Sequence, residues 1–450
     1  MKRVQSLLIF FILLALLVTA CATPSAPTSA PAPSGGEQSG GAASNQQIKL
    51  SFYYPVAVPG PITQIIDGYM ADFTKENPNI TVEPVLAGGY QDSMIKILTT
   101  LQGGGQPPDL AVLLSTDMWT LIDSDAIIPL DDCVAKIGGQ DYLNDFFPAF
   151  MLNSQANGKT WGIPFQRSTP VLYYNKQAFQ EAGLDPEKPP ANWDELVEYG
   201  KKLTKTDASG NVVQWGLEIP SDGFPYWLFQ SFAIENGQNV VGDDPSAVNF
   251  NAPSTVEALD FVVSLSKEYK IMPEGIIQWS NAPNDFTSGK AAMIYHTTGS
   301  LTNILKQASF PVGVAFHPAK KTYGAPTGGG NLYIFKDTPP EKQEAACKLI
   351  KFLTTPERAA QWSIDTGYVA TRKSAYDTQA MKDLIAQHPQ YLVARDQLEY
   401  AQRELSGHNG AELQKILGDA IQAAILGNKT SQQALDDAQA KADQMLAQFK

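Results

Sequence analysis

The chain has 450 residues, of which 43% are hydrophobic and 18% are charged, a composition typical of globular proteins rather than disordered or fibrous ones. This length exceeds the usual size of one domain, so we expect two lobes. The formal net charge of −13 argues against nonspecific nucleic-acid binding and against a polybasic grip on anionic lipid.

The first residues have the pattern of a secretory signal peptide. Lys2 and Arg3 precede a 12-residue apolar run at 7–18, which is too short to span about 30 Å of hydrocarbon. The sequence VTAC at 18–21 resembles a bacterial lipobox, and this resemblance implies cleavage before Cys21 and acylation of that cysteine. An ordinary cleaved signal with a chance cysteine is the alternative.

The next segment is expected to be a flexible tether. Between residues 22 and 47, 21 of 26 residues are Ala, Ser, Thr, Pro or Gly, and Glu37 is the only charge. Such a composition has nothing to bury and favours an extended, flexible chain. We therefore predict a lipoprotein signal peptide at 1–20, an acylated cysteine and linker at 21–47, and a body anchored to the outer face of a bacterial membrane.

The first part of the body alternates strand and helix patterns, with apolar residues at every second position or at helical spacing. The expected elements are a strand at 48–54, a helix at 62–73, a strand at 80–86, a helix at 94–101 and a strand at 110–114. The last is a continuous apolar run, as in a strand covered on both faces. This order implies right-handed parallel crossovers and an α/β sheet.

A second unit of the same kind is expected to start near residue 170. Its predicted elements are a strand at 170–174, a helix that begins at Asn192, strands at 211–216 and 291–295, and a C-terminal helix that begins at Thr430. Asn192 and Thr430 have the polar side chains that cap free backbone N–H groups at helix starts, each followed three residues later by Glu or Gln.

Motifs for catalysis and for metal binding are absent from the sequence. It has no nucleophile elbow, zinc-protease helix, dinucleotide fingerprint or phosphate loop, and no two of its four histidines stand at metal-ligand spacing on one helix. We therefore expect no metal and no cofactor. Cys133 and Cys347 are expected to be buried, small apolar residues rather than a redox pair. A pair of acids for glycoside hydrolysis needs only proximity in space, so a surface-anchored glycan-degrading enzyme stays the alternative function, with an adhesive or structural surface protein behind it.

Several stretches across residues 48–450 carry a resemblance to a known family. They are Gly89-Tyr90, Pro107-Pro108-Asp109, residues 163–176, residues 182–190, Trp193, Thr298-Gly299-Ser300-Leu301, Gly328-Gly329-Gly330, Thr366-Gly367-Tyr368 and Gln432-Gln433-Ala434-Leu435. Together they resemble family 1 extracellular solute-binding proteins of ATP-binding-cassette (ABC) importers, in the maltodextrin-binding-like group, and within it the members that bind sn-glycerol-3-phosphate.

The resemblance implies a periplasmic-binding-protein-like (type II) fold, with a ligand cleft between two α/β lobes. We expect lobe 1 at 48–166 and 296–338, and lobe 2 at 167–295 and 339–450. It also implies a monomer that captures a sugar, an oligosaccharide or a glycerol-phosphate-type solute by hinge closure and delivers it intact to a membrane permease.

The resemblance also implies a set of ligand contacts. Tyr90, Ser168, Thr297 and Tyr368 match family positions that touch ligand, and the loop of Gly329 and Gly330 supplies backbone N–H groups. For the tyrosines the alternative is core packing, and for the glycines it is a plain turn.

Other positions depart from the family pattern. Ser115 stands where the family has a glutamate, with Asp117 as a substitute, and the phosphate-binding arginine aligns with Ser406, with Arg403 nearby. Arg167 either contacts a phosphate or carboxylate of the ligand or pairs with a carboxylate across the cleft. The aromatic run 224–229, with Tyr226 and Trp227, is expected to supply a stacking face.

Overall fold

The structure is a computed structural model that describes residues 47–242 and 244–450. The predicted signal peptide, Cys21 and the tether up to residue 46 lie outside the described residues. Within the described part, every helix is too short or too polar to cross a bilayer.

Five strands form the first sheet, in the order β2-β1-β3-β13-β6. Their bounds are β1 (Ile48–Tyr54), β2 (Ile80–Leu86), β3 (Leu110–Leu114), β6 (Ile163–Ser168) and β13 (Gly328–Ile334). β1 pairs in parallel with β2 and β3, whereas β13 is antiparallel to β3 and β6. The three strands predicted before residue 115, and their parallel crossovers, are confirmed.

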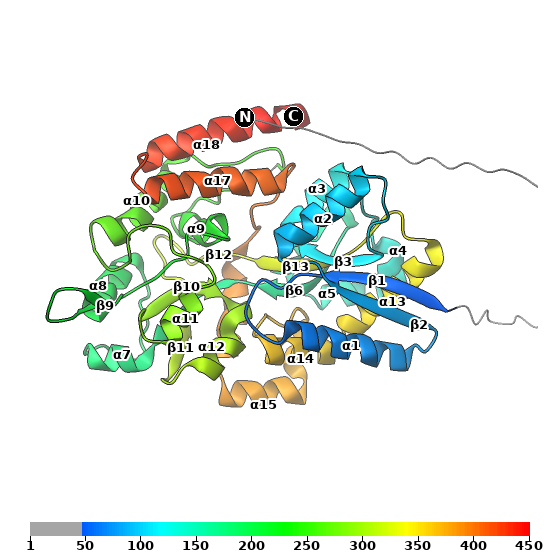
Figure 1. Cartoon of the computed structure of the whole chain (residues 1–450), viewed down its shortest axis with the longest axis horizontal. Coiled ribbons are helices and arrows are strands. Elements are labelled where there is room, and N and C mark those ends of the chain that lie inside the picture. The colour runs from blue at the N-terminus through cyan, green and yellow to red at the C-terminus, as the bar shows by residue number, and fades with distance from the viewer. Residues whose placement is uncertain (1–46, 243) are drawn as a thin grey trace, which may run out of the picture. The chain divides into compact units, whose positions relative to one another are not determined.

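Helices cover both faces of this sheet (Figure 1), which explains the continuous apolar run of β3. Leu110 and Val112 belong to the core cluster on the side of α1, whereas Ala111 and Leu113 belong to the cluster on the side of α2 and α3. The helices around the sheet are α1 (Ile62–Glu76), α2 (Tyr90–Gln102), α3 (Met118–Asp123), α4 (Asp131–Ile137), α5 (Gly139–Asn144), α13 (Pro340–Leu353) and α14 (Pro356–Thr366).

The second sheet has three strands, in the order β10-β7-β11, and is antiparallel throughout. The strands are β7 (Pro170–Asn175), β10 (Met293–Thr297) and β11 (Val312–Ala315). The prediction of a second parallel unit is therefore wrong for this sheet, because the neighbours of β7 come from late in the chain and run against it. β10 also starts two residues later than predicted, since Ala291 and Ala292 merely extend its apolar run.

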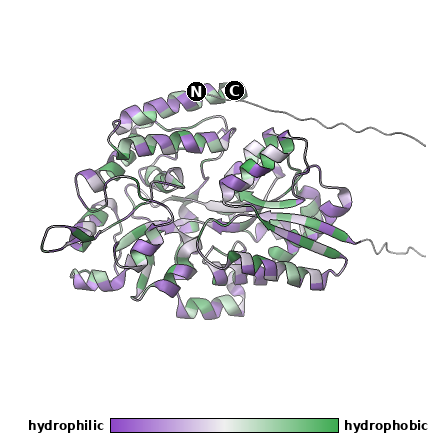
Figure 2. Ribbon diagram, viewed as in Figure 1, coloured by the Kyte–Doolittle hydropathy of each residue, from purple (hydrophilic) through white to green (hydrophobic). Residues whose placement is uncertain are grey.

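Helices surround the second sheet, namely α7 (Lys176–Glu181), α8 (Trp193–Leu203), α9 (Pro225–Glu235), α10 (Pro253–Lys267), α11 (Ala282–Thr287), α12 (Leu301–Gln307), α17 (Gly410–Ile425) and α18 (Ser431–Leu446). The predicted caps are confirmed: Asn192 accepts a hydrogen bond from the Glu195 N–H at 2.9 Å, and Thr430 forms a capping box with Gln433. In Figure 2 most helices alternate green and purple along the ribbon, as amphipathic helices do.

The remaining α-helices and strands are short. They are α6 (Pro148–Met151), α15 (Gln379–Gln387), α16 (Gln390–Gln397), β4 (Gln155–Ala156) with β5 (Lys159–Thr160), β8 (Lys205–Thr206) with β9 (Val212–Gln214), and β12 (Ala325–Pro326) with β14 (Ala401–Gln402). β9 lies within the strand predicted at 211–216.

Two segments differ from the predicted lobe boundaries. Residues 296–338 were expected with the first sheet, but β11 pairs with β7 of the second. Residues 339–450 were expected with the second sheet, but α13 packs on β1 of the first. The pattern of apolar residues marks each element but does not say which sheet it joins. The other boundaries stay a prediction.

The two cysteines of the described residues form a disulfide, which corrects the expectation of two unpaired thiols. Cys133 of α4 and Cys347 of α13 have Cα atoms 5.7 Å apart. Both side chains are buried, as expected. Because 214 residues separate the two cysteines in sequence, their proximity appears only when α13 packs beside α4.

Candidate functional site

A pocket lies between the two sheets, at the ends of β3, β6, β10 and β13. Aromatic rings make up much of its wall, namely Tyr90, Phe224, Tyr226, Trp227, Trp279 and Tyr368. The other lining residues are Ala57, Val58, Leu114, Ser168, Thr297, Gly329 and Glu404. The cavity volume is about 30 Å³, room for about two water molecules. A ligand as large as a sugar ring therefore enters only if the walls move apart.

The glycine loop brings backbone close to the pocket. Gly329 has φ +85°, and a Cβ atom there would lie 2.0 Å from the Gln166 carbonyl oxygen, so only glycine fits. A Cβ on Gly330 would lie 2.6 Å from Val112 and 3.1 Å from the ring of Tyr90. The loop therefore lets β13 pass close to β6 and lets the Tyr90 ring pack on the backbone.

Tyr368 is positioned by two glycines. Gly367 ends α14 in the left-handed region at φ +93°, which turns the chain toward the pocket. A Cβ on Gly299 would lie 2.8 Å from the Tyr368 ring, so the ring covers that backbone directly. Its hydroxyl is within 3.5 Å of Gln166 Nε2, a long contact that leaves it able to bind another group.

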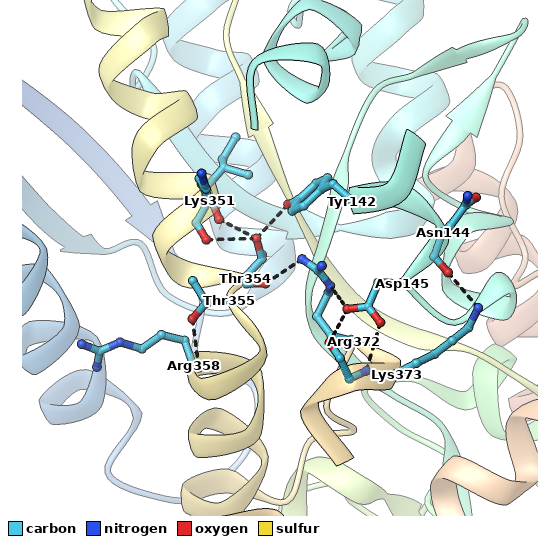
Figure 3. A network of polar contacts seen from close by, with 11 residues as sticks. Tyr142, Asn144, Asp145, Lys351, Thr354, Thr355, Arg358, Arg372 and Lys373 are labelled. Carbon is cyan, nitrogen blue, oxygen red and sulfur yellow. Dashed lines mark hydrogen bonds and ion pairs between the residues drawn. The ribbon is translucent and has the colours of Figure 1, made fainter. Parts of the chain in front are cut away.

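A buried arginine holds the segment that follows Tyr368. Figure 3 shows Arg372 between Asp145 and the end of α13: its Nε donates to Asp145 Oδ2 at 2.7 Å and its Nη1 to the Thr354 carbonyl at 2.9 Å. The guanidinium also stacks over Tyr142, at 4.7 Å from the ring centre. These contacts fix the segment to helices of the first sheet.

The two tryptophans of the wall are held by their indole N–H groups. Trp227 Nε1 donates to the Thr327 carbonyl at 2.8 Å, and Trp279 Nε1 donates to the Ala57 carbonyl at 3.3 Å. Trp279 belongs to the loop before α11, whereas Ala57 follows β1 of the first sheet. The second bond therefore joins the two sides of the pocket. The His296 ring packs against Trp279 at a tilt of 31°, with ring centres 3.9 Å apart.

Buried polar atoms without partners gather at the pocket. Glu404 Oε1 accepts a hydrogen bond from the Tyr226 hydroxyl at 3.2 Å, but Oε2 has no hydrogen-bond partner. Asp117 Oδ2 and Arg167 Nε are also buried without hydrogen-bond partners. The Tyr90 hydroxyl makes no hydrogen bond of ordinary geometry, but it is close enough to the Tyr368 hydroxyl to interact with it. Burial raises the pKa of Glu404 to about 8 and that of Asp117 to about 7. Such atoms are costly to leave unpaired, so they favour a polar ligand.

Arg167 is fully buried behind the wall. Its Nη1 donates to Asn331 Oδ1 at 3.0 Å and its Nη2 to Thr327 Oγ1 at 2.9 Å, so it ties β6 to β13. Burial lowers its pKa to about 10, which leaves it charged at neutral pH. These contacts support a bracing role in preference to a direct ligand contact.

The structure brings together most of the residues predicted to bind ligand. Those in the pocket wall are Tyr90, Ser168, Tyr226, Trp227, Thr297, Gly329 and Tyr368. Those outside it are Ser115, Asp117, Arg167, Gly330 and Arg403, although Asp117 is close enough to Glu404 to raise its pKa. The Arg403 guanidinium donates to the Gly242 carbonyl.

The sequence analysis missed five residues of the wall, namely the apolar Ala57, Val58 and Leu114, and the more informative Trp279 and Glu404. Trp279 stands alone in a loop, and no pattern distinguishes it from a core tryptophan. Glu404 lies two residues before Ser406, the position that the resemblance aligned with the phosphate-binding arginine of the family. Among the described residues, no group of three or more histidine, cysteine or acidic side chains could hold a metal ion.

The sequence pattern of the family described as bacterial extracellular solute-binding protein matches residues 68–390. The chain therefore belongs to the bacterial extracellular solute-binding proteins. Members of this class bind small-molecule solutes outside the cytoplasm and deliver them to ABC permeases.

Two sequence relatives carry the same name. The sn-glycerol-3-phosphate-binding periplasmic protein UgpB of Shigella dysenteriae serotype 1 (strain Sd197) is 29% identical over 420 residues, which cover 90% of this chain and 94% of that protein. UgpB of Escherichia coli (strain K12) has the same identity and coverage. The predicted family resemblance is confirmed.

Solved structures confirm the predicted two-lobe fold. UgpB from Mycobacterium tuberculosis in complex with glycerophosphocholine superposes with a TM-score of 0.78 and 25% identity, over 89% of this chain and 98% of that one. Maltose-bound T. maritima MalE3 has a TM-score of 0.77 at 24% identity, over 88% and 100% of the two chains, which shows the shared fold alone.

Proposed function

We propose that this chain captures a small hydroxyl-rich solute, such as a sugar, an oligosaccharide or a glycerol-phosphate derivative, and delivers it unaltered to an ABC permease. The observation that carries the proposal is the aromatic pocket between the sheets with its unpaired polar atoms. Rings bind the C–H faces of such a solute, and the polar atoms bind its hydroxyls. The ligands named for the relatives, sn-glycerol-3-phosphate and glycerophosphocholine, support this class.

Capture involves a hinge motion. The cavity of about 30 Å³ is too small for such a solute, so the ligand enters an open form and is then enclosed. The contact from Trp279 to the Ala57 carbonyl forms only when the two walls meet. Ligand that contacts both walls therefore shifts the population toward the closed form.

The pocket supports binding rather than reaction. Of the described residues that line it, Glu404 is the only carboxylate. Glycoside hydrolysis uses two acids that flank the scissile bond, one as acid and one as nucleophile or base. One lining carboxylate, already bonded to Tyr226, favours a binding protein over the glycan-degrading alternative.

We also propose that the mature chain begins at Cys21 and is held at the membrane by acyl chains on this residue. The 26 residues between Cys21 and the first strand have the composition of a tether, which would let the body reach its permease. We propose that the body acts as a monomer. Labelling of the cells with a radioactive fatty acid tests the anchor: Cys21→Ala abolishes the label if the proposal is right, and retained label overturns it.

A thermal-shift screen with sugars, oligosaccharides and glycerophosphodiesters tests the ligand class, because a ligand that binds only the folded state raises the melting temperature. For a hit, Tyr368→Phe should weaken binding about five- to tenfold, the effect of one hydrogen bond. Tyr376→Phe, also buried but outside the pocket wall, is the matched control and should leave the affinity unchanged. A screen without a hit, or conversion of a hit into product by the purified chain, would refute the proposal.

A further inference from the structure

A second cavity lies beside the disulfide, between α4, α13 and the C-terminal end of α1. Its volume is about 490 Å³, which is within the range of small-molecule sites. None of its lining residues belongs to the aromatic pocket. We call this cavity the disulfide groove, and its lining residues include Lys136, Ile137, Cys347, Lys348, Lys351 and Phe352.

One cysteine of the disulfide belongs to the wall of this groove. Cys347 lines the groove, whereas Cys133 does not. The exposed fractions of the two residues, 9% for Cys133 and 5% for Cys347, are too similar to distinguish them, so the place in the wall decides. The bond joins α13 to α4, and α4 supplies Lys136 and Ile137 to the same groove. A thiolate that enters the groove therefore meets Cys347 first.

The disulfide groove is basic, in contrast to the chain as a whole. Its charged lining residues are three lysines and two glutamates, whereas the chain has a net charge of −13. Lys136 is paired with Glu344, with Nζ and Oε1 3.1 Å apart. Lys348 and Lys351 make no ion pair with any described residue, and Glu76 is the other acid of the wall. Positive charge in a cleft attracts anions and speeds their arrival.

We propose that the disulfide groove is a site of thiol–disulfide exchange with negatively charged thiols, and that Cys347 Sγ is the atom attacked. The incoming thiolate forms a new S–S bond with Cys347, and the bond between Cys133 and Cys347 breaks. Its electron pair goes to Cys133 Sγ, which takes a proton from water. A second thiolate releases Cys347 and leaves as the oxidised disulfide of the thiol, so the protein gains two electrons. The reverse sequence forms the bond from two cysteines and the oxidised compound.

This exchange is separate from the capture of solute. Of the described residues that line the aromatic pocket, none belongs to α4 or α13. Breaking the bond removes a link between two helices of the first sheet and leaves the pocket wall in place. Exchange should therefore change the stability of the chain and leave its affinity for solute unaltered. Access through the groove also lets the bond form after α4 and α13 have packed together, in the oxidising conditions outside the cytoplasm.

Reduction of the folded chain by thiols of different charge tests the inference. The chain carries Cys21→Ser, so that Cys133 and Cys347 are its only cysteines. The probes are mercaptoethanesulfonate, which is anionic, mercaptoethanol, which is neutral, and thiocholine, which is cationic. Each rate is divided by the rate of the same thiol with hydroxyethyl disulfide, which removes differences in nucleophilicity.

At low salt, the corrected rate should be about fivefold higher for the anionic thiol than for the neutral one, and lowest for the cationic one. Because the groove is open to water, about 0.5 M salt should screen its charges and reduce the preference to about twofold or less. Each rate should increase in proportion to the concentration of thiol, since the attack takes place on the folded chain.

Variants assign the preference to the lysines of the groove. Lys348→Gln with Lys351→Gln removes the two charges without an ion pair and should reduce the preference to about twofold or less at low salt. Lys201→Gln with Lys202→Gln is the matched control, because it changes the net charge equally on α8, outside the groove. This control should keep the full preference.

Peptide mapping identifies the sulfur that is attacked. The reaction with mercaptoethanesulfonate is stopped early with acid, and the mixed disulfide is located by mass spectrometry. The adduct should be on Cys347, with a free thiol at Cys133. In the single variants, dithiobisnitrobenzoate, a disulfide with two carboxylates, should react about fivefold faster with the Cys347 thiol of Cys133→Ala than with the Cys133 thiol of Cys347→Ala.

Equal corrected rates for the three thiols, a preference that survives the change of both groove lysines, or an adduct on Cys133 would overturn the inference. A rate that does not depend on the concentration of thiol would also overturn it, because the bond would then react only after unfolding. The three thiols are compared on one chain, so the test stands even if a variant fails to fold.

Discussion

The disulfide between Cys133 and Cys347 gives a stability effect that can be worked from the chain. It closes a loop of 214 residues between α4 and α13. On the chain-entropy account, a loop of this length lowers the entropy of the unfolded chain by roughly 18 cal/mol/K, or about 5 kcal/mol at 25 °C. Measured losses for native disulfides are about 2–5 kcal/mol. We therefore expect Cys133→Ala with Cys347→Ala to lower the free energy of unfolding by about 3–5 kcal/mol.

The assay is urea unfolding followed by tryptophan fluorescence, with and without reductant. The single variant Cys133→Ala should lose as much stability as the double variant, because either change removes the bond. Reductant should destabilise the unaltered chain and leave both variants unaffected. Cys21→Ser changes the remaining cysteine of the sequence and is the matched control, with no expected loss.

Two results would refute this reasoning. A double variant within about 1 kcal/mol of the unaltered chain would mean that the bond does not restrict the unfolded state. Single-variant losses that add up in the double variant would mean that the two side chains act through separate packing contacts instead of one bond.

Arg372, Trp279 and His296 each make a contact whose loss can be measured. Arg372→Met leaves the partly buried Asp145 carboxylate without its guanidinium partner. This change should lower the free energy of unfolding, measured by urea unfolding, by about 3 kcal/mol. Trp279→Phe keeps a ring but removes the donor to the Ala57 carbonyl, so ligand should dissociate about five- to tenfold faster in stopped-flow measurements. Burial lowers the pKa of His296 to about 4. The contribution of this neutral histidine to the free energy of unfolding is therefore complete above pH 6.5, its ordinary pKa, and is lost as the pH falls toward 4. At pH 5 that loss is about 2 kcal/mol, and His296→Asn should not show it.

Each of these outcomes has a contrary one. Unchanged stability of Arg372→Met would mean that water replaces the guanidinium at Asp145. A Trp279→Phe protein that releases ligand at the rate of Trp215→Phe, a change outside the pocket wall, would show that the indole bond does not hold the pocket shut. An equal loss between pH 7 and pH 5 in His296→Asn would assign the acid sensitivity to other groups.

Local pattern was enough to predict many elements, because an apolar period is a property of the segment itself. The strands β1, β2 and β3 fall at the predicted residues, and the caps at Asn192 and Thr430 form as expected. Pairing across long sequence separations was not predictable in this way. The antiparallel partners of β7 and the attachment of α13 to the first sheet depend on contacts between segments more than 100 residues apart.

In the candidate site too, residues within short motifs could be predicted from the sequence, and residues outside such motifs could not. Tyr90, Gly329 and Tyr368 were named from short motifs, and the structure brings them into one wall. Glu404 and Trp279 belong to no motif, and only the fold carries them to the pocket. Arg167 had two readings that sequence could not separate, since both need an arginine next to Ser168. Its bonds to Asn331 and Thr327 depend on the register between β6 and β13.

Glu404 links the stability of the body to the state of its pocket. The side chain is 1% exposed, and burial raises its pKa to about 8 from an ordinary 4.5. A raised acid pKa means that its contribution to stability is present below pH 4.5 and is lost as pH rises toward 8. At pH 7 the loss amounts to about 3 kcal/mol relative to an exposed glutamate. A ligand that donates to Oε2, or places a positive charge beside it, removes this penalty only in the closed form. The empty pocket therefore stores part of the free energy that favours closure around its ligand, and a stabilising apolar replacement at this position would weaken binding.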